Sequence, residues 1–189
     1  MLAPPIFQIQ SELDRLLEWV RGRRLLIEIG TALGGTLFRF LEAAADDAVV
    51  ISIDKPGGAF GGELGQPAEA EMQSWKRPGQ QLHVLRRDSS ECVEPVRRIL
   101  DGRRADLIFF DGDHSYEAIE ADYRNYQRFG KVLAFHDIAE HHDPRIGVKR
   151  FWDQIKQDYD HREFVADPAQ GWAGIGLLIR PRAGRRAAP

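Results

Sequence analysis

Five short apolar runs, separated by longer amphipathic stretches, constrain the fold of this chain most strongly. The runs cover residues 25–29, 49–53, 82–85, 106–110 and 131–135. They are almost continuously apolar rather than alternating, which is typical of strands that are buried on both faces of a parallel sheet. Strands that alternate with helices over short connections predict an open, doubly wound α/β sheet.

The stretches between these runs are predicted to be helices, because their apolar residues recur every three to four positions. Residues 11–14 (Ser-Glu-Leu-Asp) predict a capping box that opens a helix through Val20. A late strand is expected over residues 174–180. The other helices are expected at residues 35–45, 91–100, 115–129 and 148–159. Trp75 and Trp152 fit helix packing better than a stacking platform for a ligand.

The length of 189 residues suits a single domain. We expect that domain to cover residues 1–180, with an N-terminal helical extension over 1–22 and a disordered basic tail over 181–189. The 26 basic and 29 acidic residues give a net charge of −3, which provides no general attraction to nucleic-acid phosphates. Cys92 is the single cysteine, so a disulfide framework and a zinc site of cysteine pairs are excluded.

The expected location follows from what the sequence lacks. No apolar run approaches the roughly 20 residues that a membrane-spanning helix needs. The first residues lack the basic start and apolar stretch of a signal peptide. We therefore expect a soluble cytoplasmic protein without nucleic-acid or membrane partners, and the sequence leaves a homo-oligomer open.

A glycine-rich turn follows the first predicted strand, in residues 28–36 (EIGTALGGT). Glycine lets the backbone turn tightly and approach a ligand closely. A phosphate-binding P-loop is disfavoured because Gly35 stands where a lysine would be needed, and the spacing departs from the dinucleotide pattern G-x-G-x-x-G. Two interpretations stay open: a tight structural turn, and a loop for S-adenosylmethionine (SAM), where Glu28 would help to position the methionine amino group.

Single acids end the next two predicted strands. Asp54 can accept hydrogen bonds from a ribose diol, whether of NAD or of SAM, or it can be a turn residue. Asp88 can accept from an adenine amine, or it can cap the helix that follows it.

The strongest local signal is the segment Asp-Gly-Asp-His-Ser-Tyr at residues 111–116, directly after a very apolar strand. A second polar pair, His136 and Asp137, ends the fifth predicted strand. These strand ends should be neighbours, and a carboxylate from one with a histidine and a carboxylate from the other can bind a divalent cation. Salt bridges and helix caps are the structural alternative.

Two loops should lie on the same sheet edge, beyond the carboxyl ends of the strands. Residues 55–65 (KPGGAFGGELG) predict a mobile loop that could act as a lid. His141, His142 and Asp143 lie in the loop after the fifth strand, where solvated polar residues are the simpler interpretation than an added metal ligand.

Taken in order, these motifs resemble those of the class I SAM-dependent methyltransferases. The motifs are IEIGTALGGT, ISID, RRDSSE, FFDGDHSYEAIEADY and VLAFHDI, and the resemblance covers residues 25–180. The DGDHSY segment is most similar to a subgroup that includes macrolide sugar O-methyltransferases and cephalosporin-hydroxylase-like proteins. The resemblance implies a Rossmann-like sheet of seven strands with the last antiparallel, formed by residues 174–180 and paired with 163–166.

The resemblance also implies which residues bind ligands. SAM would lie along Glu28, Gly30, Thr31, Gly34, Asp54, Asp88 and Asp111. Asp111 and Asp137 match metal ligands of the metal-dependent relatives, and the relatives' general base falls on His114. His136 stands where a relative carries a glutamate, which moves the expected metal from magnesium towards manganese, iron, cobalt or zinc.

These assignments predict a metal-dependent O-methyltransferase for a small-molecule or sugar hydroxyl. Asp111, His136 and Asp137 would hold the metal and orient the substrate, and His114 would accept the hydroxyl proton. An NAD-type oxidoreductase of the same fold and a non-catalytic SAM-binding protein are the alternatives.

Overall fold

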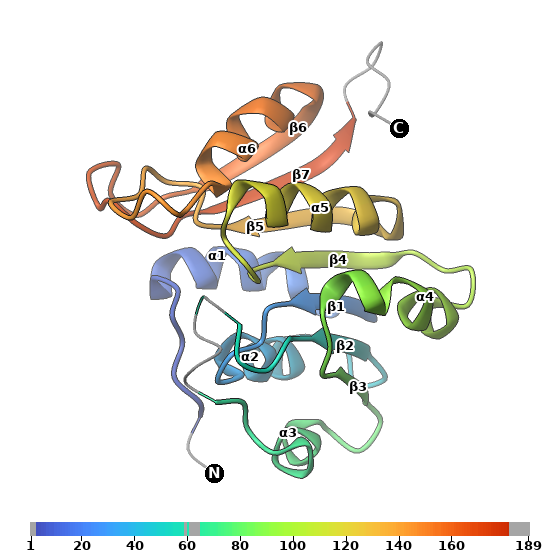
Figure 1. The fold of residues 1–189 in the computed structure, drawn as a ribbon. Helices are drawn as coiled ribbons and strands as arrows, with labels where there is room; N and C mark the ends of the chain where they lie inside the picture. The colour runs from blue at the N-terminus through green and yellow to red at the C-terminus, as the bar shows by residue number, and fades with distance from the viewer. Residues whose placement is uncertain (1–2, 59, 61–64, 182–189) are drawn as a thin grey trace.

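Seven strands form one mixed sheet in the computed structural model, which describes residues 3–58, 60 and 65–181. The strands are β1 (Leu25–Ile29), β2 (Val49–Ile53), β3 (Gln81–Leu85), β4 (Ala105–Phe110), β5 (Gly130–His136), β6 (Tyr159–Phe164) and β7 (Ile175–Pro181). Their order is β3-β2-β1-β4-β5-β7-β6 (Figure 1). β7 is antiparallel to both of its neighbours and the other pairs are parallel. The expected Rossmann-like sheet with an antiparallel last strand is therefore confirmed.

Helices cover both faces of this sheet. They are α1 (Gln10–Val20), α2 (Gly35–Ala43), α3 (Glu69–Trp75), α4 (Ser89–Leu100), α5 (Tyr116–Tyr126) and α6 (Val148–Ile155). Figure 1 shows α4, α5 and α6 on the near face, with α1 and α2 behind the strands. Each face has its own apolar core: Leu26 packs with α1, α2 and α3, whereas its neighbour Ile27 packs with α4, α5 and α6. Successive strand residues point to opposite faces, so continuously apolar runs are buried on both.

Two predicted boundaries were wrong. The first helix has no capping box, because it begins at Gln10 after Ile9, which makes no side-chain cap. The predicted helix over 148–159 ends at Ile155 and continues as a short 3₁₀ turn, and Tyr159 opens β6. β6 therefore starts earlier than the expected 163–166, because its pairing with β7 runs from Tyr159 to Phe164.

Helix α3 was not predicted, since only Met72 and Trp75 in it are buried and no apolar stripe announces it. Both tryptophans that were assigned to helix packing do pack there: Trp75 is buried in α3 and Trp152 in α6. The predicted disordered tail falls on residues 182–189, outside the described residues. Within the described residues, no helix is both long enough and apolar enough to cross a membrane.

The fold brings the predicted site residues to one edge. The carboxyl ends of β1, β2, β4 and β5 meet on the left of Figure 1, where the long loops also gather. The chain before α1 runs along the same edge (Figure 1). A site at this edge can therefore draw on segments from the whole sequence.

Candidate active site

The glycine-rich turn after β1 is built around backbone conformations that favour glycine. Gly30 has a φ of 94° and Gly34 a φ of 82°. A Cβ on Gly30 would lie 1.9 Å from the carbonyl oxygen of Asp111, so the turn passes directly against the end of β4. Asp54 holds the turn, because its Oδ2 accepts hydrogen bonds from the backbone nitrogens of Thr31 (3.0 Å) and Ala32 (2.6 Å).

A first cavity of about 540 Å³ opens beside this turn. It lies over the ends of β1, β2 and β4 and the starts of α4 and α5. Of the residues expected to bind SAM, four line it: Gly30, Asp54, Asp88 and Asp111. Asp122 and Asn125 of α5 line it as well and were not predicted. Its volume and polar walls suit a ligand with several hydrogen-bonding groups.

The acids of the first cavity already hold backbone groups. Asp88 caps α4, where its Oδ1 accepts from Ser90, and these bonds lower the pKa of Asp88. Burial raises the pKa of Asp54, against the hydrogen bonds that it accepts from Ala32 and Thr31. Both structural interpretations of these residues are therefore true, and both carboxylates still face the cavity.

Glu28, Thr31 and Gly34 do not line the first cavity. Glu28 is fully buried, and its Oε2 accepts a hydrogen bond from Thr31 Oγ1 at 3.1 Å, while Oε1 has no partner among the described residues. Burial, reinforced by the charge of Asp111, raises the pKa of Glu28 well above its usual range. Thr31 faces a second cavity, and Gly34 lies against the ring of Trp75.

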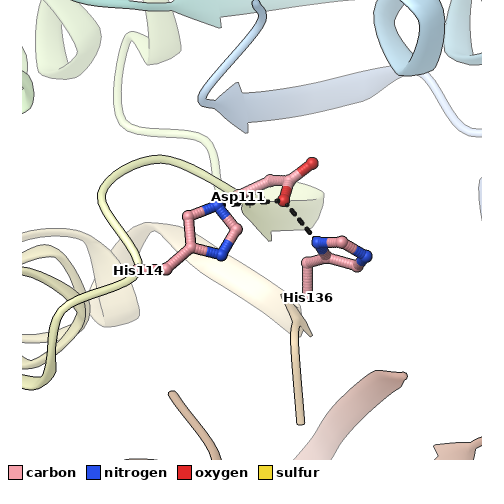
Figure 2. Close-up of side chains that lie close together, drawn as sticks. All are labelled: Asp111, His114 and His136. Carbon is pink, nitrogen blue, oxygen red and sulfur yellow. Dashed lines mark ion pairs between the residues drawn. The ribbon is translucent and has the colours of Figure 1, made fainter. Parts of the chain in front are cut away.

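The ends of β4 and β5 carry a compact cluster, which Figure 2 shows: Asp111, His114 and His136. Ligand atoms of these three residues all lie within 4.8 Å of one another. Oδ1 of Asp111 is 2.8 Å from Nδ1 of His136 and 3.7 Å from Nε2 of His114. The sequence prediction that the two strand ends converge is thus correct in its geometry.

His136 has the electrostatics of a ligand without its cation. Its ring is buried, and neither nitrogen makes a well-aligned hydrogen bond within the described part of the chain. Burial alone would lower the pKa of His136, but the adjacent carboxylate of Asp111, with Asp137 and Glu12, raises it to about 9. Two imidazoles and a carboxylate form a donor set that fits a divalent transition-metal ion.

Asp137 lies outside this three-residue cluster, and its partners differ from those expected. It has a φ of 60°, which turns its side chain back along the loop. Oδ2 lies 2.6 Å from Nδ1 of His114, and Oδ1 accepts from the backbone nitrogen of Ala173 at 3.0 Å. Burial would raise the pKa of Asp137, but His114 and His136 together hold it well below its usual range. The structure thus joins Asp137 to His114 as an aspartate–histidine pair.

A second cavity of about 360 Å³ lies on the other side of the cluster. Asp111, His114, His136, Asp137 and His141 line its polar part. Its other walls come from the chain before α1 and from later loops, including the two exposed aromatic side chains Phe7 and Trp172. Sequence analysis missed these walls, because only the fold brings these segments to the sheet edge.

The loop after β2 lies between the two cavities. The ring of Phe60 is 5.3 Å from that of His114, and Phe60 lines both cavities. Lys55 reaches Oδ2 of Asp88 at 3.3 Å. Residue 59 and residues 61–64 lie outside the described residues, so the lid remains a prediction.

The polar loop after β5 is mainly self-contained. Asp143 accepts from Arg145, and His141 Nδ1 accepts from the backbone nitrogen of Asp143 at 3.0 Å. His142 is exposed. The simpler interpretation of this loop fits these contacts, although His141 also lines the second cavity.

Comparisons with solved structures give the fold independently. The chain has a TM-score of 0.66 to an O-methyltransferase from Bacillus cereus in complex with SAH, at 16% identity, covering 95% of this chain and 84% of that one. It has a TM-score of 0.60 to the O-methyltransferase TomG from Streptomyces achromogenes in complex with SAM, at 20% identity, covering 90% and 79%. The calicheamicin methyltransferase CalS11 gives 0.65 at 18% identity, covering 92% and 77%.

Sequence comparison extends this result. The uncharacterized protein y4gI of Sinorhizobium fredii is 26% identical over 153 residues, which cover 74% of this chain but only 16% of that protein. The chain therefore spans about a sixth of the length of this curated relative. A family profile described as a methyltransferase domain matches residues 27–138, from β1 to the loop after β5. Because the match covers more than half of the chain and both strand-end clusters, the chain belongs to this family of methyltransferase domains.

Proposed function

We propose that this chain is a SAM-dependent O-methyltransferase that methylates a hydroxyl group of a small molecule or sugar. The observation that carries the proposal is that the two cavities meet at the cluster, where Gly30 and Asp111 line both. A donor in the first cavity and an acceptor in the second would then face each other across Asp111. The titles of the similar structures, which name SAM, SAH and O-methyl transfer, agree with this arrangement.

In the first cavity, Asp54 and Asp88 would bind the hydroxyl and amino groups of the donor. Both carboxylates face the cavity, and carboxylates accept strong hydrogen bonds from such groups. Glu28 acts from beneath the turn, where its buried charge favours a positive group above it. SAM, when bound, supplies an activated methyl group.

Asp111 and His136 would hold a divalent cation, and His114 would act as the general base. A bound cation lowers the pKa of a coordinated hydroxyl and fixes its orientation. The bond from Asp137 places the proton of neutral His114 on Nδ1, which leaves the Nε2 lone pair to accept the acceptor's proton. This assigns Asp137 to orienting His114 rather than to binding metal, and Asp137 stabilises the imidazolium that forms.

The reaction balances with these groups alone. The acceptor oxygen forms a bond to the methyl carbon as the carbon–sulfur bond breaks, and the sulfur keeps the electron pair and becomes neutral. The hydroxyl proton passes to Nε2 of His114. Positioning two reactants across a shared wall supplies a large part of such a rate.

We further infer that residues 3–180 work as one unit. Leu13 and Leu16 of α1 are buried in the core of the sheet, and Gln8 contacts Asp111. The predicted N-terminal extension would thus be part of the domain that carries the site.

The experiment uses purified protein with labelled SAM, a panel of sugars and aromatic diols, and Mn²⁺, Mg²⁺ or a chelator. We expect methyl transfer that falls at least about a hundred-fold in chelator. His114→Ala should abolish turnover while keeping SAM and Mn²⁺ binding, whereas His136→Ala should lose Mn²⁺ binding. His142→Ala, a change in an exposed loop histidine, is the matched control and should behave like the native protein.

Each alternative has its own outcome. Full turnover in chelator would refute the cation role, and loss of Mn²⁺ binding in His114→Ala would make His114 a ligand. Calorimetry that shows NAD binding in place of SAM would favour the oxidoreductase. SAM binding without transfer to any acceptor would favour a binding protein.

A further inference from the structure

The chain before α1 reaches into the cluster through one side chain, Gln8. Gln8 is only 7% exposed, although it lies in an irregular segment ahead of the first helix. Its Nε2 donates to Oδ2 of Asp111 at 2.6 Å, across 103 positions of sequence. Its Oε1 accepts a hydrogen bond from Oγ1 of Thr36 at 2.8 Å. Both ends of the amide are therefore used.

These bonds divide the work of the Asp111 carboxylate. Oδ2 is bound to Gln8, while Oδ1 lies 2.8 Å from His136 and 3.7 Å from His114. A carboxylate can only accept hydrogen bonds, so the amide nitrogen of Gln8 must face it. The Thr36 hydroxyl then fixes the amide from its other end, on the first turn of α2.

We propose that Gln8 is a positioning residue that holds Asp111 so that Oδ1 faces the two histidines and a cation between them. This inference rests on the proposed cation site. A glutamine suits the task because it donates to the carboxylate without bringing a positive charge that would compete with a cation. Groups that hydrogen-bond to metal-binding side chains orient them, and their loss typically weakens metal binding about 10- to 100-fold.

The backbone around Gln8 supports a fixed rather than a passing contact. A Cβ on Gly35 would lie 2.0 Å from the carbonyl oxygen of Pro5, so this segment passes directly over the start of α2. Pro5, Ile6, Phe7 and Gln8 all line the second cavity beside the cluster. The segment thus forms a wall of the cavity and anchors its metal-facing carboxylate.

The test measures Mn²⁺ affinity by calorimetry and by the electron paramagnetic resonance signal of free Mn²⁺, without any turnover. Gln8→Leu should weaken Mn²⁺ binding by about ten-fold or more, because Asp111 loses its anchor. Thr36→Val leaves the Gln8–Asp111 bond and should cost only a few-fold. The double variant should be no weaker than Gln8→Leu alone, because both changes act through Asp111.

Gln10→Leu is the matched control, since Gln10 is exposed and its amide bonds only to Asp14 on the helix surface. It should bind Mn²⁺ like the native protein. Thermal midpoints and SAM affinity are measured for each variant, so that a misfolded protein is recognised and Thr36→Val then decides alone.

Two failures are distinguishable. If the native protein and Gln8→Leu bind Mn²⁺ equally well, Gln8 does not position Asp111 and the cation site stands. If no variant, including the native protein, binds Mn²⁺, the cation site itself is refuted and this inference with it.

Discussion

The two cavities differ in how the chain builds them. The first is lined by residues that directly follow strand ends, such as Asp54 and Asp88, whose carboxylates also hold the local backbone. The second is assembled from distant segments: the chain before α1, the cluster, and Trp172 near β7. In the first cavity polar groups are largely partnered, whereas in the second both nitrogens of His136 are not, within the described residues. A stable scaffold thus borders a site whose polar groups wait for a ligand.

Breaking the shared wall should have the largest effect. Gly30→Ala places a Cβ 1.9 Å from the Asp111 carbonyl oxygen at a φ of 94°, so both steric overlap and backbone strain oppose folding. We expect the free energy of unfolding to fall by about 3 kcal/mol or more, with loss of both SAM and Mn²⁺ binding. Urea denaturation measures the loss.

Gly22→Ala separates strain from overlap. Gly22 also has a positive φ, of 69°, but a Cβ there would meet nothing within 4 Å. This variant should lose only about 1 kcal/mol. Equal losses in both variants would mean that the close approach of the turn to β4 is not the cause.

The independence of the two cavities can be tested through Asp54. Asp54 lines the first cavity and not the second. Asp54→Asn removes the charge but keeps one acceptor for the turn, so SAM affinity should fall about 10- to 100-fold while Mn²⁺ affinity stays native. Calorimetry with each ligand checks this, and Asp46→Asn, a change in a surface acid, is the control. Parallel loss of both affinities would show that the turn couples the cavities.

The same contrast explains what could be predicted from the sequence. Strands that are buried on both faces, such as β1, have continuous apolar runs, and the polar groups at their ends follow directly. β6 (Tyr159–Phe164) was misplaced because it is an edge strand with polar residues facing outwards. The first cavity was therefore largely predictable.

The second cavity was not predictable, because its contacts are long-range. Nothing near Gln8 signals a bond to Asp111, 103 positions away. The pairing of Asp137 with His114 depends on a positive φ at Asp137, which no local pattern indicates for an aspartate. Convergence of the strand ends could be predicted, but not which atoms would face each other.

Asp122 offers a pH test inside the first cavity. Burial raises the pKa of Asp122 from 3.8 to about 6, although Ser89 donates to it at 2.5 Å. Below about pH 4 the carboxyl is neutral in both folded and unfolded chains, so it costs nothing. As the pH rises through 6, the folded state must hold a buried charge, and this part of the stability is lost.

Asp122→Asn removes that charge and keeps an acceptor for Ser89. At pH 7.5 it should raise the free energy of unfolding by about 1 to 2 kcal/mol, and at pH 4 by much less. Urea denaturation at the two pH values measures the difference. An equal gain at both pH values would mean that ionisation of Asp122 is not the cause.

The smallest effect is expected at the mouth of the second cavity. Trp172 is 43% exposed and Phe7 is 47% exposed, and both line the cavity beside the cluster. Because a flat apolar surface there can pack on an acceptor, Trp172→Ala should raise the acceptor KM several-fold, about 1 kcal/mol, and leave the SAM affinity unchanged. Phe7→Ala should act in the same direction, and initial rates at varied acceptor concentration measure both. A change in SAM affinity without a change in acceptor KM would assign these aromatic side chains to the donor side and reverse the roles of the two cavities.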